Sequence, residues 1–404
     1  MNAAFCTDTE LSDLARSVLE KRGITSPEEI RAFLDPAYYV PTDPKELPGL
    51  ADTVELLMAA ISRGDKICVY GDYDVDGITS TVLLVSLLRS FNAPVVYHVP
   101  DRFSEGYGMN ERVVRELAQD GVKVILTCDC GISNFHEVAL AVELGMQVFI
   151  TDHHLLPPEL PPAHSIVNPQ FLAHGHKARH LAGVGVAYML ARAVLENAGR
   201  GQDTEEFLDL VALGTVADVV PLSGENRCLL QMGLLKLKNS TRPGISALSK
   251  AAKISLSDIT EEEVGFQLVP RLNSAGRISS AALGVELLLT EKPENAAELA
   301  AELDSLNRKR RALGEEMSQE AQSMLGLTYG SRPIVLYQPH WHHGVIGIIA
   351  GRLAELHKVP VLLMSLKENG VTVTGSARSI EGIHIFQVLR KCGEFLVKYG
   401  GHAG

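Results

Sequence analysis

The chain has 404 residues and a formal net charge of −12, and 46% of its residues are hydrophobic. This size and composition predict a soluble protein with at least two domains, and the acidic balance argues against a protein that coats nucleic acid non-specifically. No apolar run reaches the roughly 18 residues of a membrane span. The first residues lack the pattern of a secretory signal. We therefore expect a cytoplasmic protein that does not associate with membranes.

The first half of the chain predicts an α/β domain. Residues 8–35 have a helical pattern and are followed by a proline-rich connector, so residues 1–50 are interpreted as a helical N-terminal lead. Strands are then expected at 66–70, 94–99, 123–128 and 147–151. Helices are expected at 79–91, 110–119, 134–144, 181–198, 204–216, 227–238 and 281–289. This alternation predicts a parallel sheet with flanking helices over 51–290, with its functional site at the carboxyl ends of the strands.

A long helix and a second, smaller α/β domain are expected in the remainder of the chain. Residues 293–326 keep helical spacing, and we assign 291–328 as a connecting helix. Its basic run, 308–311, indicates either a solvated face or a nucleic-acid contact. The domain at 329–404 should contain strands at 333–337, 360–364 and 371–376 and a helix at 344–357.

Three carboxylates follow the first predicted strand. Asp72, Asp74 and Asp76 lie in a short turn before the next helix, and alternate side chains of an extended segment point the same way. Carboxylates held this close repel one another, and a divalent cation relieves that repulsion. The alternative is a solvated turn that caps the helix.

Further acidic and histidine residues stand where other apolar elements end. Asp129 follows the predicted third strand, His153 and His154 follow the fourth, and Asp218 ends a predicted helix. Carboxylate and imidazole ligands without thiolates suit Mn²⁺ or Mg²⁺, and several carboxylates favour two ions. Two such ions suit phosphoryl chemistry. The six cysteines lack zinc-ribbon spacing and are expected to be reduced.

The motifs taken together resemble a known family. The segments 72–77 (DYDVDG), 129–131 (DCG), 152–154 (DHH) and 217–218 (AD) are similar to the four signature motifs of the DHH phosphoesterase superfamily. Within it, the chain resembles the RecJ family of single-strand-specific 5′→3′ DNA exonucleases. The segments that carry this second resemblance are 101–108, 181–187, 271–277, 341–347, 375–379 and 400–404.

The resemblance implies roles for particular residues. The implied ligands of two Mn²⁺ or Mg²⁺ ions are Asp74, Asp76, Asp129, His153 and Asp218, with Asp129 bridging the ions. Asp72, His154 and Arg277 are the implied catalytic residues. The implied contacts to the substrate are Arg102, Asn273, Ser376, Arg378 and His402. Tyr70 stands where related pyrophosphatases carry a histidine ligand, which argues against pyrophosphatase activity.

The expected activity is hydrolysis of single-stranded DNA to 5′-mononucleotides, in DNA repair and recombination, by in-line attack of activated water. Two alternatives stay open: a phosphodiesterase of the same superfamily that degrades oligoribonucleotides or cyclic dinucleotides, and a non-catalytic nucleic-acid-binding relative. The resemblance further suggests a monomer, with a single-strand-binding protein or a RecQ-type helicase as partners.

The chain stops within a glycine-rich segment at Gly404. Members of the RecJ family continue past this point, finishing the second domain and adding an OB-fold. We therefore expect an incomplete second domain without the OB-fold, weaker binding of the strand, lower processivity and poor folding of residues 330–404.

Overall fold

The computed structural model describes residues 11–326, 332–367 and 370–397. These residues form two compact units. The larger unit comprises the chain through Ala275 together with Ser280–Asp304, and the smaller unit comprises Gly276–Ser279 and the chain from Ser305 onward. Among the described residues, no helix is both long and apolar enough to cross a bilayer.

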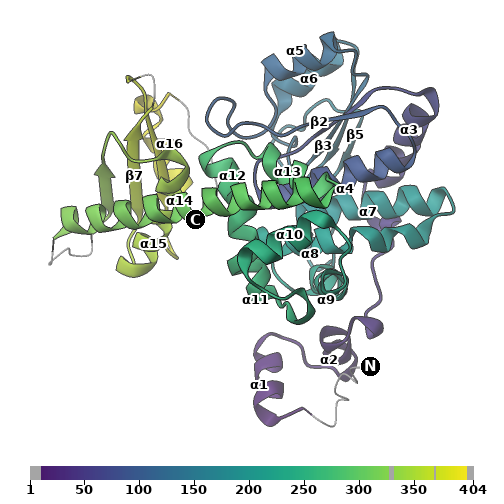
Figure 1. Cartoon of the computed structure of the whole chain (residues 1–404), viewed down its shortest axis with the longest axis horizontal. Helices are drawn as coiled ribbons and strands as arrows, with labels where there is room; N and C mark the ends of the chain where they lie inside the picture. The colour runs from purple at the N-terminus through teal and green to yellow at the C-terminus, as the bar shows by residue number, and fades with distance from the viewer. Residues whose placement is uncertain (1–10, 327–331, 368–369, 398–404) are drawn as a thin grey trace. The chain divides into compact units, whose positions relative to one another are not determined.

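The sequence predicts a parallel sheet, and such a sheet forms the centre of the larger unit, with one strand more than the four predicted (Figure 1). The strand order is β2-β1-β3-β4-β5, and every neighbouring pair is parallel. The strands are β1 (Ile67–Tyr70), β2 (Val95–His98), β3 (Val124–Cys128), β4 (Gln147–Thr151) and β5 (Ser165–Val167). The run Ser165–Val167 was too short to be predicted as a strand. β1 and β3 are buried along their whole length, as expected of strands with helices on both faces.

Helices cover the sheet of the larger unit. α5 and α6 lie on one face, and α4 lies among α7, α8 and α13 (Figure 1). From α3 to α9, the α-helices of this unit are α3 (Leu50–Arg63), α4 (Val75–Ser90), α5 (Glu111–Gln119), α6 (Phe135–Glu143), α7 (Gly183–Asn197), α8 (Leu208–Ala217) and α9 (Gly224–Lys238). They are followed by α10 (Pro243–Ala252), the short α11 (Glu261–Glu263), a π-helix (Val264–Leu268), α12 (Val269–Ile278) and α13 (Ala282–Leu289).

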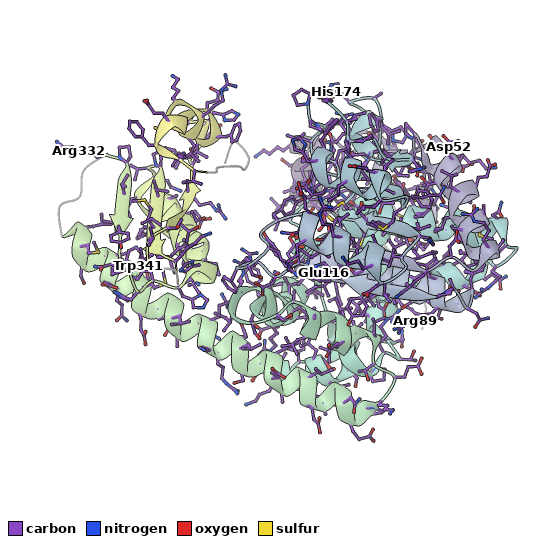
Figure 2. All side chains as sticks on the ribbon, turned by 90° about the horizontal axis from the view of Figure 1, so that it is seen from above. Asp52, Arg89, Glu116, His174, Arg332 and Trp341 are labelled. Carbon is purple, nitrogen blue, oxygen red and sulfur yellow. The ribbon has the colours of Figure 1, made fainter. Side chains whose placement is uncertain are left out.

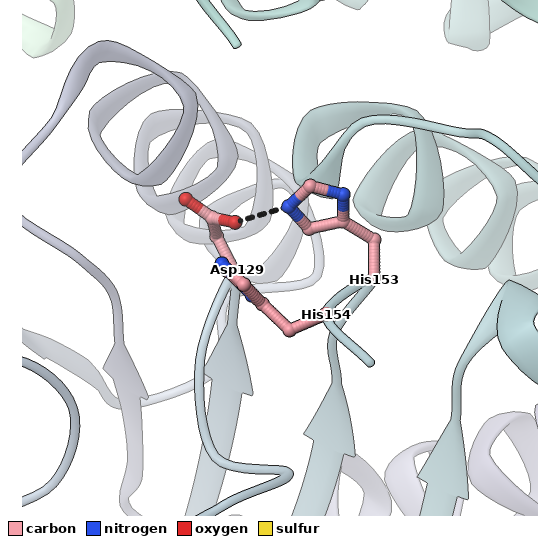
Figure 3. A group of neighbouring side chains, drawn as sticks. All are labelled: Asp129, His153 and His154. Atoms are coloured by element: carbon pink, nitrogen blue, oxygen red, sulfur yellow. Dashed lines mark ion pairs between the residues drawn. The ribbon is translucent and has the colours of Figure 1, made fainter. Parts of the chain in front are cut away.

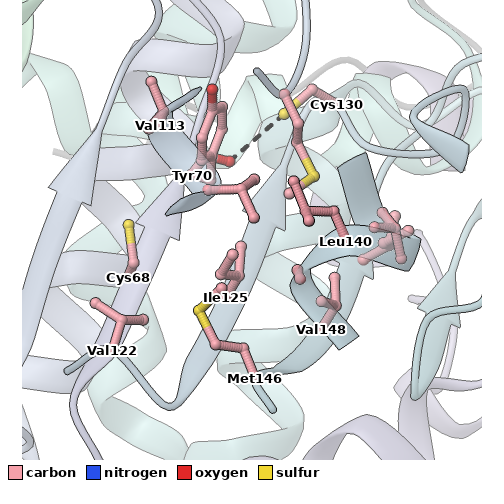
Figure 4. Packing of buried hydrophobic residues seen from close by; sticks show 14 residues of the cluster. Cys68, Tyr70, Val113, Val122, Ile125, Cys130, Leu140, Met146 and Val148 are labelled. Carbon is pink, nitrogen blue, oxygen red and sulfur yellow. Dashed lines mark hydrogen bonds between the residues drawn. The ribbon is translucent and has the colours of Figure 1, made fainter. Parts of the chain in front are cut away.

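One apolar cluster joins the sheet to α5 and α6 (Figure 4). Alternate strand residues, Cys68 and Tyr70 of β1 and Ile125 of β3, face Val113 of α5 and Leu140 of α6. This period of two follows from the pleat of the strand. The Tyr70 hydroxyl is directed toward the Gly108 carbonyl oxygen at 3.5 Å, so Tyr70 is a core residue.

The N-terminal lead differs from its prediction. It forms two helices, α1 (Asp13–Lys21) and α2 (Pro27–Leu34), and the expected start at residue 8 lies outside the described residues. The break comes at Gly23, whose φ of 78° is left-handed and incompatible with a continuing helix. Leu19 is buried but Leu14 is 76% exposed, so the predicted apolar stripe is only partly covered.

The smaller unit contains a three-stranded sheet of order β6-β7-β8 in which β8 is antiparallel to β7. Its elements are β6 (Ile334–Tyr337), α15 (His343–His357), β7 (Val361–Leu366), β8 (Val373–Arg378) and α16 (Ile385–Lys391). The long helix α14 (Pro293–Leu325) begins in the larger unit and ends in the smaller one. Met317 of α14 packs against Trp341, which is buried (Figure 2) and donates its indole N–H to Glu320 Oε2 at 2.7 Å.

Candidate metal centre

The topology of the sheet determines where the site forms. The chain steps from β1 to β2 on one side and returns to β3 on the other side of β1. In open parallel sheets such a reversal leaves a crevice outside the carboxyl ends of the two strands. Asp72 and Asp74 directly follow β1, Asp129 directly follows β3, and His153 follows β4.

The turn after β1 is shorter than the sequence suggested. Helix α4 begins at Val75, four residues before the predicted start, so the expectation of three aspartates alternating along an extended segment is wrong. Asp74 is the N-cap, and its Oδ1 accepts the Gly77 N–H at 3.1 Å, while Asp76 lies in the first helical turn. The early start requires Gly77, because a Cβ there would lie 2.6 Å from the Asp72 backbone. Asp74 therefore caps helix α4, and the same short turn still brings the carboxylates of Asp72 and Asp74 close together.

The Asp76 carboxylate is held by the start of α7. Its Oδ2 accepts the Gly183 N–H at 2.6 Å and its Oδ1 accepts the Val184 N–H at 2.8 Å. A Cβ on Gly183 would lie 2.7 Å from the Asp129 side chain. Glycine at this position therefore lets the N-terminus of α7 contact two carboxylates at once, where its N–H groups and dipole stabilise negative charge.

His153 lies among three carboxylates. Its Nε2 is 3.0 Å from Asp129 Oδ1 (Figure 3) and 3.9 Å from Asp76 Oδ2, and its Nδ1 is 3.6 Å from Asp218 Oδ2. Asp129 adopts a left-handed φ of 59°, which turns the chain sharply where β3 ends. Asp218 is the C-cap of α8.

Several of these buried atoms have no hydrogen-bond partner. Among the described residues they include Asp72 Oδ1, Asp129 Oδ1 and His153 Nε2. The last two lie close together but not in hydrogen-bonding geometry. Buried polar atoms without a hydrogen-bond partner destabilise a fold. Carboxylate and imidazole groups arranged in this way fit a shared cation. The ligand atoms form two compact groups, Asp72–Asp74–Asp129 and Asp76–His153–Asp218.

The electrostatics of these groups also fit cations. Burial, reinforced by Asp218, raises the pKa of Asp76 to about 7, and burial with Asp74 raises that of Asp218 to about 7. Burial and neighbouring carboxylates raise the pKa values of Asp72 and Asp129 well above the usual range. Burial lowers the pKa of His153, which keeps its imidazole neutral and able to bind a metal. Mn²⁺ or Mg²⁺ would neutralise the carboxylates.

Asp152 has a role that the sequence analysis did not assign. Asp152 is fully buried and accepts the His154 Nδ1–H at 2.7 Å. On the other side of the ring, His154 Nε2 lies 3.3 Å from the Tyr107 hydroxyl. That hydroxyl also lies 3.4 Å from the Asp129 carbonyl oxygen. Burial opposes the charge on His154, but the bond to Asp152 outweighs it and raises the pKa of His154 to about 9. His154 can reach a third group, Asp129–His153–His154, but its charge makes it a hydrogen-bond donor rather than a ligand. The first position of the 152–154 motif was the only sequence signal for Asp152.

The predicted substrate residues fall in both units. In the larger unit, the Arg102 guanidinium lies 4.0 Å from the centre of the Tyr73 ring. Its positive charge lowers the pKa of Asp72 and so offsets part of the rise that burial causes. Asn273, in α12, is half-buried in the same unit. His402 lies outside the described residues.

The smaller unit brings three predicted residues to one helix. Arg277 Nη1 donates to the Gly344 carbonyl oxygen at 3.4 Å in the first turn of α15. Because β8 begins and ends two residues later than predicted, Ser376 lies within the strand and Arg378 is its last residue. Both face Gly347, where a Cβ would lie 2.9 Å from Ser376 Oγ. Arginine and hydroxyl groups at a helix N-terminus suit an anion.

Comparison with known proteins agrees with this geometry. The model of the DHH family N-terminal domain matches residues 66–215, and that of the DHHA1 domain matches 330–404. The single-stranded-DNA-specific exonuclease RecJ of Escherichia coli is 39% identical over 98% of this chain and 71% of its own length. A crystal structure of exonuclease RecJ bound to manganese superposes with a TM-score of 0.79 and 36% identity, covering 88% of this chain and 89% of that one.

The chain belongs to the RecJ family. It spans about half the length of another relative, RecJ of Bacillus subtilis, with which it shares 41% identity over 97% of its own residues and 49% of that protein. The match extends across both units, so the RecJ family assignment applies to the metal centre and to the smaller unit alike.

Proposed function

We propose that this protein is a metal-dependent exonuclease that hydrolyses single-stranded DNA from the 5′ end to 5′-mononucleotides. The observation that carries this proposal is the pair of ligand groups at one edge of the sheet, built from residues that follow β1, β3 and β4, from the first turn of α4 and from the end of α8. RecJ family membership supports the substrate class and the use of Mn²⁺ or Mg²⁺.

We assign the first cation to Asp72, Asp74 and Asp129 and the second to Asp76, His153 and Asp218, whose ligand atoms lie close together in each group. Two divalent cations held by these residues would activate a water molecule and would neutralise charge on the attacking and leaving oxygens.

The other residues bind and orient the strand. His154, cationic at neutral pH and held by Asp152, is placed to donate to a phosphate oxygen near Asp129. Arg102 contributes a second cation beside Asp72. In the smaller unit, Arg277, Ser376 and Arg378 would bind a terminal phosphate.

The test is Asp129→Ala, with Asp203→Asn as the control because Asp203 makes only an exposed pair with Arg200. We expect Asp129→Ala to lose at least about 1,000-fold in hydrolysis of a labelled single strand, since the first ligand group loses a member and His153 of the second group loses the carboxylate 3.0 Å from its Nε2. The control should keep wild-type activity. Wild-type turnover by Asp129→Ala would refute the two-metal assignment.

The same assay separates the alternatives. A long single strand should be degraded far faster than a dinucleotide or a cyclic dinucleotide, and labelled 5′ ends should release mononucleotides first. Metal binding without turnover would favour a non-catalytic role. We extend the proposal to a cytoplasmic monomer that cooperates with a single-strand-binding protein or a RecQ-type helicase, which sedimentation and pull-down with purified partners would test.

A further inference from the structure

A small cavity lies in the smaller unit between α14 and α15, apart from the residues assigned above. Its volume is about 90 Å³, and its lining includes three arginines, Arg310, Arg311 and Arg352. Its apolar wall comes from Val345 and Ile349 of α15. A different face of α15 meets β8: a Cβ on Gly347 would lie 2.9 Å from Ser376, and one on Gly351 would lie 3.9 Å from Arg378.

Arg310 is held in a fixed orientation. Its Nε and Nη2 donate to Asn307 Oδ1 at 3.2 and 3.0 Å, and Asn307 is itself only 5% exposed. A buried amide that accepts two N–H groups of one guanidinium fixes the plane of that guanidinium. Arg310 is therefore pre-organised at the cavity, and its Nη1 is not used by Asn307.

The cavity carries an excess of positive charge, with three arginines against one glutamate, Glu315. Within the described residues, Arg310, Arg311 and Arg352 form no ion pair, and Glu315, which also lines the cavity, is not within pairing distance of them. Burial, and then the charges of Arg352 and Arg311, lower the pKa of Arg310. Three like charges around a partly apolar cavity repel one another, and an anion bound there would relieve that repulsion.

The cavity suits an oxyanion with several acceptor atoms. A guanidinium group can donate two parallel hydrogen bonds to two oxygens of a phosphate. A halide ion offers only one acceptor atom. Gly314 leaves room at this point, since a Cβ there would come within 3.7 Å of Val345 and Ile349. Arg311 and Arg352 are exposed, so the site is open on one side to a longer chain.

We propose that this cavity binds a backbone phosphate of the nucleic-acid strand, as a contact separate from Ser376 and Arg378. The inference rests on the proposed function, which supplies the strand. A phosphodiester is favoured over free phosphate because Arg311 and Arg352 are exposed at the cavity and the neighbouring Arg308 and Lys309 of α14 are exposed as well, so further phosphates of a strand would meet positive charge.

The experiment measures binding of a labelled 24-nucleotide single strand in EDTA, which prevents hydrolysis, over a series of salt concentrations. Arg311→Gln and Arg352→Gln are the test variants, since both side chains are exposed and their loss leaves the fold intact. Arg390→Gln, an exposed change of the same charge on α16, is the control. Arg352→Lys keeps the charge but removes the planar fork.

We expect each test variant to weaken strand binding about 5- to 10-fold and to reduce the slope of log Kd against log salt by about 0.7, as for one lost phosphate contact on a single strand. The lysine variant should keep the wild-type slope with weaker binding, and the control should bind like wild type. Hydrolysis of a dinucleotide should not change, because it is too short to reach a second contact.

Each other outcome overturns the inference in a recognisable way. Wild-type binding by both test variants, with strand hydrolysis intact, refutes the cavity contact and leaves the proposed function standing. If inorganic phosphate raises the melting temperature of wild type but not of Arg352→Gln, and strand binding ignores the substitutions, the cavity takes free phosphate instead. Absence of strand binding and hydrolysis in wild type refutes both proposals.

Discussion

Replacing Asp152 by asparagine tests how the buried carboxylate stabilises the site. Asp152 accepts four N–H groups: His154 Nδ1–H at 2.7 Å and the backbone N–H groups of His153, His154 and Ile132 at 2.7, 3.1 and 3.0 Å. Only Ile132 bonds to Oδ2. In Asp152→Asn the amide NH₂ would face one of these donors, so one buried N–H would lose its acceptor.

The size of the effect follows from His154. Its pKa is raised from 6.5 to about 9, which corresponds to roughly 3 kcal/mol of folding free energy. Because the folded-state pKa lies above the ordinary value, this stability is complete below about pH 6.5 and is lost as the pH rises through about 9. The pKa of Asp152 is lowered, so its carboxylate stays ionised over this range. The unpaired N–H costs a further ~1–3 kcal/mol at any pH.

Urea unfolding in EDTA, followed by circular dichroism at about pH 6 and about pH 10, measures this difference. We expect Asp152→Asn to lose about 2–3 kcal/mol more at the lower pH than at the higher one. Fluorescence of Trp341, the single tryptophan and a core residue of the smaller unit, serves as an internal control and should change little. An equal loss at both pH values would refute the Asp152–His154 pairing as the source of the stability.

Three further results are expected. Gly183→Ala should weaken Mn²⁺ binding and reduce strand hydrolysis at least about 100-fold, because the new Cβ would lie 2.7 Å from Asp129. The control is Gly175→Ala, which should behave like wild type because no atom lies within 4 Å of its Cβ. Equal activity of the two variants would contradict the close packing at Gly183. Mn²⁺ affinity should increase by up to about 100-fold for each unit that the pH rises toward 7 and should level off above about pH 8, since Asp76 and Asp218, with pKa values of about 7, must each release a proton. Calorimetry that showed no pH dependence would count against this. Addition of EDTA at about pH 8 should lower the melting temperature of metal-loaded wild type, because removal of the metal leaves ionised carboxylates that repel one another. The melting temperature of Gly183→Ala should hardly change, because this variant binds little metal that EDTA could remove.

Local patterns predicted much of the larger unit. The apolar runs that became β1, β3 and β4 ended where the sequence indicated, and the residues after them, Asp129 and His153 among them, came together at one edge of the sheet. This works because the carboxyl ends of parallel strands share an edge. The start of α4 was missed because a helix can begin at a capping aspartate, and the pattern of apolar residues alone does not show the cap.

The sequence by itself determined which ligand chemistry is available: carboxylates and imidazoles at the ends of buried elements, with no thiolate set of zinc spacing. Only the tertiary structure decided how those groups are held. The N–H groups of Gly183 and Val184 reach Asp76 from a helix more than one hundred residues away, and Asp152 fixes the charge of His154. Such contacts depend on how α7 and β4 pack beside β1 and β3, which no local periodicity encodes, because periodicity records only which face of an element is buried.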